Sequence, residues 1–276
     1  MPMSTQWNNL LLHLGVWDGS FTRLSPRGDM VEETLTRVML EGLDENRTIR
    51  QTIQRFSATP GEEMQAKVLE YSTLNRSTLF FENGSFSQGS IQYGPFSEFG
   101  AEMGFIQGDR RMRLVILYGT DGHLSRVTLI REHRQETDAS ERPPLTLDQL
   151  LGEWCGEAKT LYADLRTPID APTTLTLSQQ GDRLQQRMTS AGFDFSSTAT
   201  IDGSTLRFET DTATNQVVLL PDGASYTAPL SIPKGRPFRL EAGWMLEGDR
   251  RQRLIRSYDA NGTWVSLTLV TEQRIA

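Results

Sequence analysis

Short stretches in which apolar and polar residues alternate recur along this chain of 276 residues. In STLRFETD, Leu206 and Phe208 fall on one face of an extended chain, and TTLTLSQ places Leu175 and Leu177 in the same way. Alternation with a period of two is typical of a strand that buries one face. The segment 48–56, TIRQTIQRF, spaces its isoleucines four apart as a helix would, but its Thr and Ile content favours a strand.

Turn signals separate these stretches at intervals of roughly ten residues. They include ENGS, GTDG, IDGS, LPDG and DANG. Asn-Gly and Asp-Gly supply the positive φ angles that tight hairpins need. Many short strands at this spacing predict an all-β fold, either a sandwich or an up-and-down barrel.

Two segments interrupt the strand pattern. STQWNNLLLHLG and TLDQLLG each predict a short helix that ends at a glycine, Gly15 in the first and Gly152 in the second. In the second segment, Thr146 and Gln149 have the spacing of a capping box. Each predicted helix leads directly into a Gly-x-Trp motif, within LGVWDG and LGEWCG respectively.

The chain also contains an internal repeat. Residues 108–134 align without a gap with residues 248–274, and both segments begin with Gly-Asp-Arg-Arg and end with Glu-x-Arg. Upstream, EMGF (102–105) matches EAGW (241–244) with a spacing that differs by one residue, as a β-bulge would produce. Since each half begins with the Trp motif and ends with the Glu-x-Arg motif, two copies of one domain are the simplest explanation.

The two copies meet at a polar and charged segment. This segment, ETDASERPP (136–144), ends in Pro143 and Pro144, which is typical of a short stiff linker. We therefore expect two domains, at residues 1–137 and 144–276, each an antiparallel β-barrel preceded by a short helix.

A short helix, a Gly-x-Trp motif on the first strand and an Arg on the last strand resemble the pattern of the lipocalin, or calycin, superfamily. In that superfamily the Trp lies across the bottom of the barrel and the Arg packs on it. The resemblance assigns these roles to Trp17 with Arg134, and to Trp154 with Arg274. An Arg over an indole face contributes about 0.5–2 kcal/mol when partly desolvated, so we interpret the four residues as structural, closing two tandem lipocalin-like barrels.

A longer segment resembles a narrower family. LLPDGASYTAPLSIPKGRPFRLEAGWML (219–246) is similar to cyanobacterial and plastid proteins that carry two lipocalin-like barrels in about this length. A plant relative in that family is the biogenesis factor required for chloroplast ATP synthase, which assists assembly of the catalytic head. The resemblance implies a non-enzymatic docking or assembly factor, with head subunits of an F-type ATP synthase as partners. The chain lacks a lipocalin-type Thr-Asp-Tyr segment, so the similarity is closer to cytosolic barrels than to secreted lipocalins.

The overall charge and hydropathy restrict the partners. A net charge of −7 argues against a broad phosphate-binding surface, so we expect no nucleic acid partner, although a local basic patch is compatible with this charge. No run of 18 apolar residues occurs, so we expect no membrane span. The N-terminal sequence lacks a basic segment followed by an apolar one, so we expect no signal peptide.

Cysteine and histidine usage restricts the chemistry further. The single cysteine, Cys155, excludes an intramolecular disulfide and indicates a reducing compartment, so we expect a cytoplasmic protein. The three histidines, His13, His123 and His133, are scattered, and we predict no metal or cofactor, although carboxylates alone suffice for a hard cation. We interpret Cys155 as an inert structural thiol and His13 as a surface or rim residue.

The motif Gly-Asp-Arg-Arg has two interpretations. A pair of guanidinium groups on a hairpin suits an anion or a protein partner, which makes Arg250 and Arg251 candidate binding residues. Alternatively, the motif is a Gly-Asp turn flanked by arginines and is repeated only because the domain is repeated. The second interpretation is favoured, because a unique active site would not usually survive identically in two diverged copies.

Glu102 and Glu241 occupy matching places beside Gly-aromatic pairs, and Trp244 belongs to the second pair. In a barrel lumen these carboxylates would meet an arginine or the polar head of a ligand. Alternatively, they point to solvent. We include Glu102, Glu241 and Trp244 among the candidate binding residues, and we predict no catalytic residue, since Gly-x-Ser-x-Gly, phosphate-loop and dinucleotide-binding motifs are all lacking.

Three classes of function remain. A docking or assembly factor predicts a groove between the barrels and filled lumens. A carrier of an apolar small molecule, such as a fatty acid, carotenoid or bilin, predicts a hollow lumen with few polar groups. An enzyme related to bilin lyases predicts an Arg/Glu constellation inside one barrel only. We rank the three classes in this order.

Overall fold

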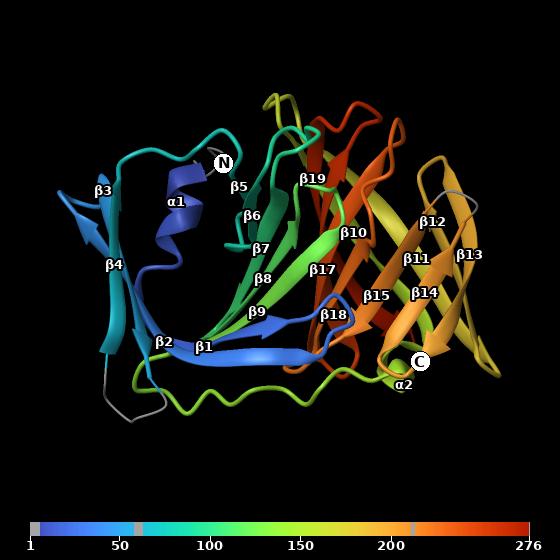
Figure 1. Cartoon of the computed structure of the whole chain (residues 1–276), viewed down its shortest axis with the longest axis horizontal. Helices are drawn as coiled ribbons and strands as arrows, with labels where there is room; N and C mark the ends of the chain where they lie inside the picture. The colour runs from blue at the N-terminus through green and yellow to red at the C-terminus, as the bar shows by residue number, and fades with distance from the viewer. Residues whose placement is uncertain (1–5, 58–62, 211–212, 276) are drawn as a thin grey trace.

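The computed structural model describes residues 6–57, 63–210 and 213–275, and nearly all of its regular structure is antiparallel β-sheet. Within these ranges the helices are α1 (Gln6–Leu11) and α2 (Leu147–Leu150), each shortly before the first strand of one half of the chain. Figure 1 shows two curved sheets side by side, one for each half. The predicted all-β class with two tandem barrel-like domains is confirmed.

The N-terminal half forms a nine-stranded sheet with the order β4-β3-β2-β1-β9-β8-β7-β6-β5. The first strand, β1, pairs with the last, β9, as the repeat predicts. The edge strands β4 and β5 do not pair among the described residues, so this sheet is a curled half-barrel rather than the expected closed barrel. The strands are β1 (Gly15–Leu24), β2 (Met30–Leu43), β3 (Thr48–Phe56), β4 (Glu63–Tyr71), β5 (Leu79–Phe80), β6 (Phe86–Gly89), β7 (Phe99–Gln107), β8 (Arg110–Tyr118) and β9 (Leu124–Arg134).

Helix α1 occupies the space between the two unpaired edges (Figure 1). The Gln6 side chain donates to the carbonyl oxygen of Phe80 at 2.9 Å and accepts from its backbone N–H at 2.6 Å. Gln6 thus makes the two hydrogen bonds that a neighbouring strand would make to β5. On the other side, Trp7 packs edge-on against Tyr71 of β4, with ring centroids 6.4 Å apart. The helix therefore fills the gap that strand pairing leaves open.

The C-terminal half forms a closed barrel of ten strands in sequential order. Its closure joins β10 to β19, and Trp154 lies opposite Arg274 in that ladder. Closure leaves no free sheet edge in this half. The strands are β10 (Gly152–Tyr162), β11 (Ile169–Gln180), β12 (Arg183–Ser190), β13 (Phe193–Asp202), β14 (Thr205–Glu209), β15 (Thr214–Leu219), β16 (Ala224–Pro229), β17 (Phe238–Glu247), β18 (Arg250–Tyr258) and β19 (Trp264–Ile275).

The glycines after the two helices begin strands instead of ending helices. Helix α1 ends at Leu11 and α2 at Leu150, whereas Gly15 and Gly152 are the first residues of β1 and β10. Their φ angles are 123° and 112°, which side chains with a Cβ rarely adopt. At Gly15 an added Cβ would also lie 2.7 Å from Nη1 of Arg134, so the glycine leaves room for the arginine.

A single apolar core joins the two halves. The outward faces of β7 and β8 pack on the outward faces of β16 and β17, and their buried side chains form one continuous cluster. Phe99 of the first half contacts Phe238 and Tyr258 of the second, with ring centroids 5.7 and 5.0 Å apart. Burial of this size stabilises one particular arrangement of the two domains.

Arg256 is fully buried where the two halves meet. Its guanidinium lies 3.6 Å from the Trp264 ring centroid and donates to the carbonyl oxygens of Ser77 and Ser90, each at 3.2 Å. A buried cation needs such partners, because removing it from water is costly. Arg256 of the second half therefore depends on the backbone of the first half.

The segment between the domains is a packed strap. Arg142 stacks on Trp244 with its guanidinium 4.1 Å from the ring centroid, and it donates to the carbonyl oxygen of Leu246 at 2.9 Å and to Gln107 Oε1 at 2.7 Å. Below it, Asp222 accepts from the backbone N–H of Arg142 at 2.7 Å. The segment that was expected to be a short stiff linker thus also fastens the two domains together.

Candidate functional site

Trp17 of the N-terminal half lies between two arginines. The guanidinium carbons of Arg134 and Arg111 are each 4.5 Å from its ring centroid. Its indole N–H donates to the carbonyl oxygen of His13 at 2.9 Å, so the ring is fixed to the chain that leads out of α1. Trp17 and Arg134 are direct neighbours in the ladder between β1 and β9.

The C-terminal half repeats this arrangement around Trp154. Arg251 and Arg274 lie 4.2 and 5.7 Å from its ring centroid, and its indole N–H donates to the carbonyl oxygen of Leu150 at 2.8 Å. The sequence assigned Arg274 to this tryptophan but placed Arg251 among binding candidates. Arg111 and Arg251 are the second arginines of the two Gly-Asp-Arg-Arg motifs. Their identical place in both copies was the sequence feature that could have assigned them to the two tryptophans.

A buried carboxylate holds the arginines of the first half in place. Glu132 accepts from Arg111 at 2.6 and 2.8 Å, and from Arg113 at 3.0 and 2.9 Å. Arg113 also donates to Glu102 at 2.8 Å. Burial alone would raise the pKa of Glu132, but Arg111 and Arg113 lower it to about 2. The cluster is therefore a network of charged pairs, in which each charge is compensated.

The second half carries the matching cluster with looser geometry. Glu272 accepts from Arg251 through one close contact, and from Arg253 at 2.9 and 3.3 Å. Arg253 also donates to Glu241 at 3.2 Å. Among the described residues Nη2 of Arg251 has no partner, whereas Nη2 of Arg111 bonds Glu132.

His13 covers the cluster of the first half. The expectation of a surface or rim position is wrong, because this side chain is only 2% exposed. Its Nε2 lies 2.8 Å from the carbonyl oxygen of Gly84, and its ring packs edge-on against Phe80 and Phe86. Burial and the nearby charge of Arg111 lower the pKa of His13 to about 3, so the imidazole is neutral at physiological pH.

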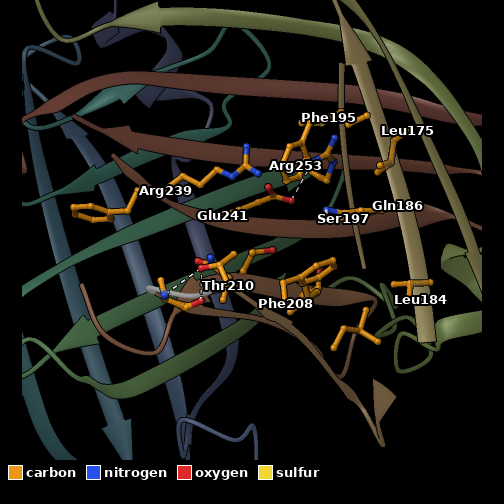
Figure 2. Close-up of a pocket in the computed structure, with 18 of the residues that line it drawn as sticks. Leu175, Leu184, Gln186, Phe195, Ser197, Phe208, Thr210, Arg239, Glu241 and Arg253 are labelled. Carbon is orange, nitrogen blue, oxygen red and sulfur yellow. Dashed lines mark hydrogen bonds and ion pairs between the residues drawn. The ribbon is translucent and has the colours of Figure 1, made fainter. Parts of the chain in front are cut away.

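The C-terminal barrel instead contains a cavity of about 790 Å³. Helix α2 contributes Leu150 to its closed end, and the apolar lining residues Leu175, Leu184 and Leu206 lie nearby. Figure 2 shows Leu175 and Leu184 on one side of the cavity and Arg239 and Glu241 toward the other. A volume of this size is typical of small-molecule sites.

The cavity continues to the open end of the barrel. Arg236 and Arg239 line it there, beside Glu209 and Thr210. Both arginines are exposed. Within the described ranges neither has an ion pair or a side-chain hydrogen bond. The cavity therefore has an apolar closed end and a mouth that carries two free cationic groups.

The candidate binding residues lie in four separate places. Glu241 and Arg251 line the cavity, and Glu102 occupies the position equivalent to Glu241 in the first half, where it pairs with Arg113. Trp244 is buried between the domains, and its indole N–H donates to the carbonyl oxygen of Asp222 at 2.9 Å. Arg250 is half-exposed at the closed end and pairs with Glu247 at 3.7 Å.

Arg110 and Cys155 each have surroundings that differ from those of the matching residue in the other copy of the repeat or from a fully buried position. Arg110, the counterpart of Arg250, is buried and donates to Asp222 across the domain boundary at 2.8 Å. The first arginine of the motif thus serves different purposes in the two copies. Cys155 is half-buried beside Thr174, with Sγ 3.7 Å from Oγ1, on a wall position next to Trp154.

Two tandem barrel-like domains of antiparallel strands, each with arginines stacked on a buried tryptophan at one end, define the class of this chain. It belongs to the DUF3598 family. Residues 3–137 match the domain described as "Domain of unknown function (DUF3598), N-terminal". Residues 141–275 match the domain described as "Biogenesis factor required for ATP synthase 1, C-terminal domain".

A solved structure supports the family assignment. A DUF3598 protein of unknown function from Nostoc punctiforme is 48% identical, and the match covers 99% of this chain and 100% of that chain with a TM-score of 0.93. An S-type phycobiliprotein lyase from Guillardia theta matches 47% of this chain and 90% of its own at 13% identity, with a TM-score of 0.38. No curated protein matches the sequence.

No helix in the described part of the chain is both long enough and apolar enough to cross a membrane.

Proposed function

We propose that this chain is a non-enzymatic docking or assembly factor that acts in the cytoplasm, and that its partner is the catalytic head of an F-type ATP synthase. The observation that carries the proposal is the match of residues 141–275 to the C-terminal domain of a protein named as a biogenesis factor for ATP synthase. The matched residues include the whole closed barrel.

The fold offers a surface for such a partner. Leu35 on β2 and Val68 on β4 are 59% and 56% exposed, and the strand registers place both on the face of the sheet that points away from Trp17. Next to Leu35, a groove of about 660 Å³ runs between this face and linker residues 139–141. Exposed apolar side chains beside a polar groove are typical of protein-binding surfaces.

A binding experiment with purified components tests this proposal. The chain is mixed with the isolated α, β and γ subunits of an ATP synthase head from a photosynthetic organism, and complexes are detected by size-exclusion chromatography with light scattering. We expect a complex with at least one subunit, and we expect the double variant Leu35→Glu/Val68→Glu to weaken it about tenfold or more. The matched control is Leu165→Glu on the other domain, where Leu165 is 75% exposed. If the chain forms a complex with none of the three subunits, the proposal is contradicted.

A second candidate function is carriage of a small molecule in the C-terminal barrel. The docking interpretation expected filled lumens, whereas the cavity of about 790 Å³ agrees with the hollow lumen expected for a carrier of a fatty acid, carotenoid or bilin. The expectation of few polar groups is not met, because charged side chains such as Glu241 and Arg253 line the cavity. The Arg/Glu cluster occurs in both halves, which differs from what the enzyme interpretation expected. Replacing Leu206 by Trp fills part of the cavity and should abolish binding of any such ligand.

A further inference from the structure

The two sides of the C-terminal cavity indicate which chemistry it accepts. We propose that it binds an amphipathic acid, which is a molecule with a long apolar body and one anionic end, with the apolar body at the closed end and the anion at the mouth. This inference rests on the second candidate function, and it adds the class of ligand and its direction in the barrel.

One wall of the barrel carries apolar side chains from the closed end to the mouth, and two polar side chains that also line it, Gln186 and Ser197, bond each other at 2.8 Å. Leu175 and Leu177 of β11 line its deep part, and the strand register places Ile169 of the same strand on the same face at the open end. On β13, Phe195 lines the cavity and Phe193 lies two residues nearer the mouth. An elongated apolar molecule would be in contact with this wall over its whole length.

The apolar wall is incompletely covered at the mouth. Ile169, Phe193 and Phe195 are 54%, 44% and 40% exposed, and the two phenylalanine rings stack with centroids 6.1 Å apart. Exposed aromatic and branched side chains on the inner rim of a cavity lose contact with water when a ligand enters. Their position extends the apolar contact beyond the buried leucines, which favours a long ligand over a compact one.

Positive charge that has no partner is confined to the other side of the mouth. Arg253 and Arg251 deeper in the cavity are balanced by Glu241 and Glu272. Among the described residues neither Arg236 nor Arg239 has an ion-pair partner, and one carboxylate that lines the mouth with them, Glu209, leaves an excess of positive charge there. Figure 2 shows Arg239 at one end of the cavity, far from Leu184. A carboxylate at the mouth would pair with these guanidinium groups.

The opposite direction of binding is disfavoured by the closed end. Leu150, Leu177 and Leu206 lie at that end beside Arg251, whose charge is already paired with Glu272. An anion placed there would lose its hydration and would meet a single donor without a partner among the described residues, Nη2 of Arg251, whereas two guanidinium groups without ion pairs lie at the mouth. A neutral apolar molecule would use the leucine wall but not the arginines. The distribution of charge therefore selects an anionic amphiphile over both a wholly apolar ligand and a small polar anion.

Fluorescence titration with one probe pair tests the proposal on the intact chain. The probes are cis-parinaric acid, a fluorescent 18-carbon fatty acid, and its methyl ester, which has the same body without the charge. We expect the acid to bind about tenfold more tightly than the ester. The double variant Arg236→Gln/Arg239→Gln should remove this preference by weakening the acid alone, since both side chains are exposed and the fold does not depend on them.

The matched control is Arg47→Gln/Arg50→Gln, which makes the same change in net charge on the exposed surface of the other domain and should leave the preference intact. Two results would contradict the proposal that the anionic end of the ligand pairs with Arg236 and Arg239. They are equal affinity for acid and ester, and a preference for the acid that survives Arg236→Gln/Arg239→Gln. Neither result would contradict the carrier function. If neither probe binds the native chain, the proposed ligand class is wrong. If a probe binds the Leu206→Trp variant as tightly as the native chain, the ligand does not occupy this cavity, and both the carrier function of the cavity and the ligand class are wrong.

Discussion

Arg110 of the N-terminal half donates to Asp222 of the C-terminal half at 2.8 Å, and both side chains are buried. The same carboxylate accepts from the backbone N–H of Arg142 in the linker. One anion thus holds an arginine of the first domain, the linker and a turn of the second domain. Together with the shared apolar core, it makes the tandem barrels a single structural unit.

The variant Asp222→Ala should lower the free energy of unfolding by about 3–5 kcal/mol, because it leaves the Arg110 charge buried without its partner. Chemical denaturation monitored by tryptophan fluorescence measures this change. Glu247→Gln is the control, since its partner Arg250 is half-exposed and such pairs contribute about 0–1 kcal/mol. Equal effects of the two variants would show that the domains are not joined through Asp222.

Trp17 should contribute about as much to the free energy of unfolding as Asp222 does. Its ring is fully buried between Arg111 and Arg134, so Trp17→Ala should cost about 3–5 kcal/mol of stability. Phe96→Ala provides an aromatic control, because Phe96 is 88% exposed and its removal should change stability by less than about 0.5 kcal/mol. A stable Trp17→Ala protein would show that the stacked arginines are not needed for the curled sheet.

His13 should make the stability of the protein depend on pH in the mildly acidic range. Burial lowers the pKa of His13 from 6.5 to about 3, so the unfolded chain binds a proton between these values and the folded chain does not. Stability from this group is therefore fully present above pH 6.5 and is lost as the pH falls toward 3. Replacing His13 by Phe, which fits the aromatic surroundings, should flatten the stability profile between pH 6.5 and 4.5.

Glu132 should govern a lower pH range. Its pKa is lowered from 4.5 to about 2 by Arg111 and Arg113, which outweigh burial. The unfolded chain takes up a proton on this group first, so the stability it contributes is present above pH 4.5 and is lost between pH 4.5 and 2. Glu132→Gln should be destabilised at pH 7 and should show a weaker dependence on pH in this range. An unchanged slope would contradict the assigned role of Glu132.

Much of the fold follows from local pattern. The repeat of Gly-x-Trp and Glu-x-Arg placed Trp17 near Arg134, because the first and last strands of a barrel-like sheet are neighbours. The open N-terminal sheet gave no comparable signal, since β5 has only two residues, and on the edge of β5 that faces away from β6 the Gln6 side chain makes the hydrogen bonds to Phe80. A single glutamine side chain that makes the hydrogen bonds of a missing strand leaves no periodic pattern of apolar residues in the sequence.

The position of Trp244 shows a second limit of sequence pattern. The outward face of strand β17 is apolar, with Leu240 and Trp244, whereas its inward face carries Arg239 and Glu241 as well as Met245. Alternation alone identifies an inner and an outer face, but it does not reveal that a second domain covers the outer one. The hollow lumen was likewise undetermined, because leucines that line a cavity and leucines that fill a core alternate in the same way.

The most direct test of the proposed function is the amount of assembled ATP synthase head in cells of the host that lack this chain, measured by native gel electrophoresis and immunoblotting. We predict that assembled head falls at least several-fold while its subunits are still synthesised. The native chain should restore it, and the Leu35→Glu/Val68→Glu variant should not. Unchanged levels of assembled head would contradict the assembly role and leave carriage of a small molecule as the function.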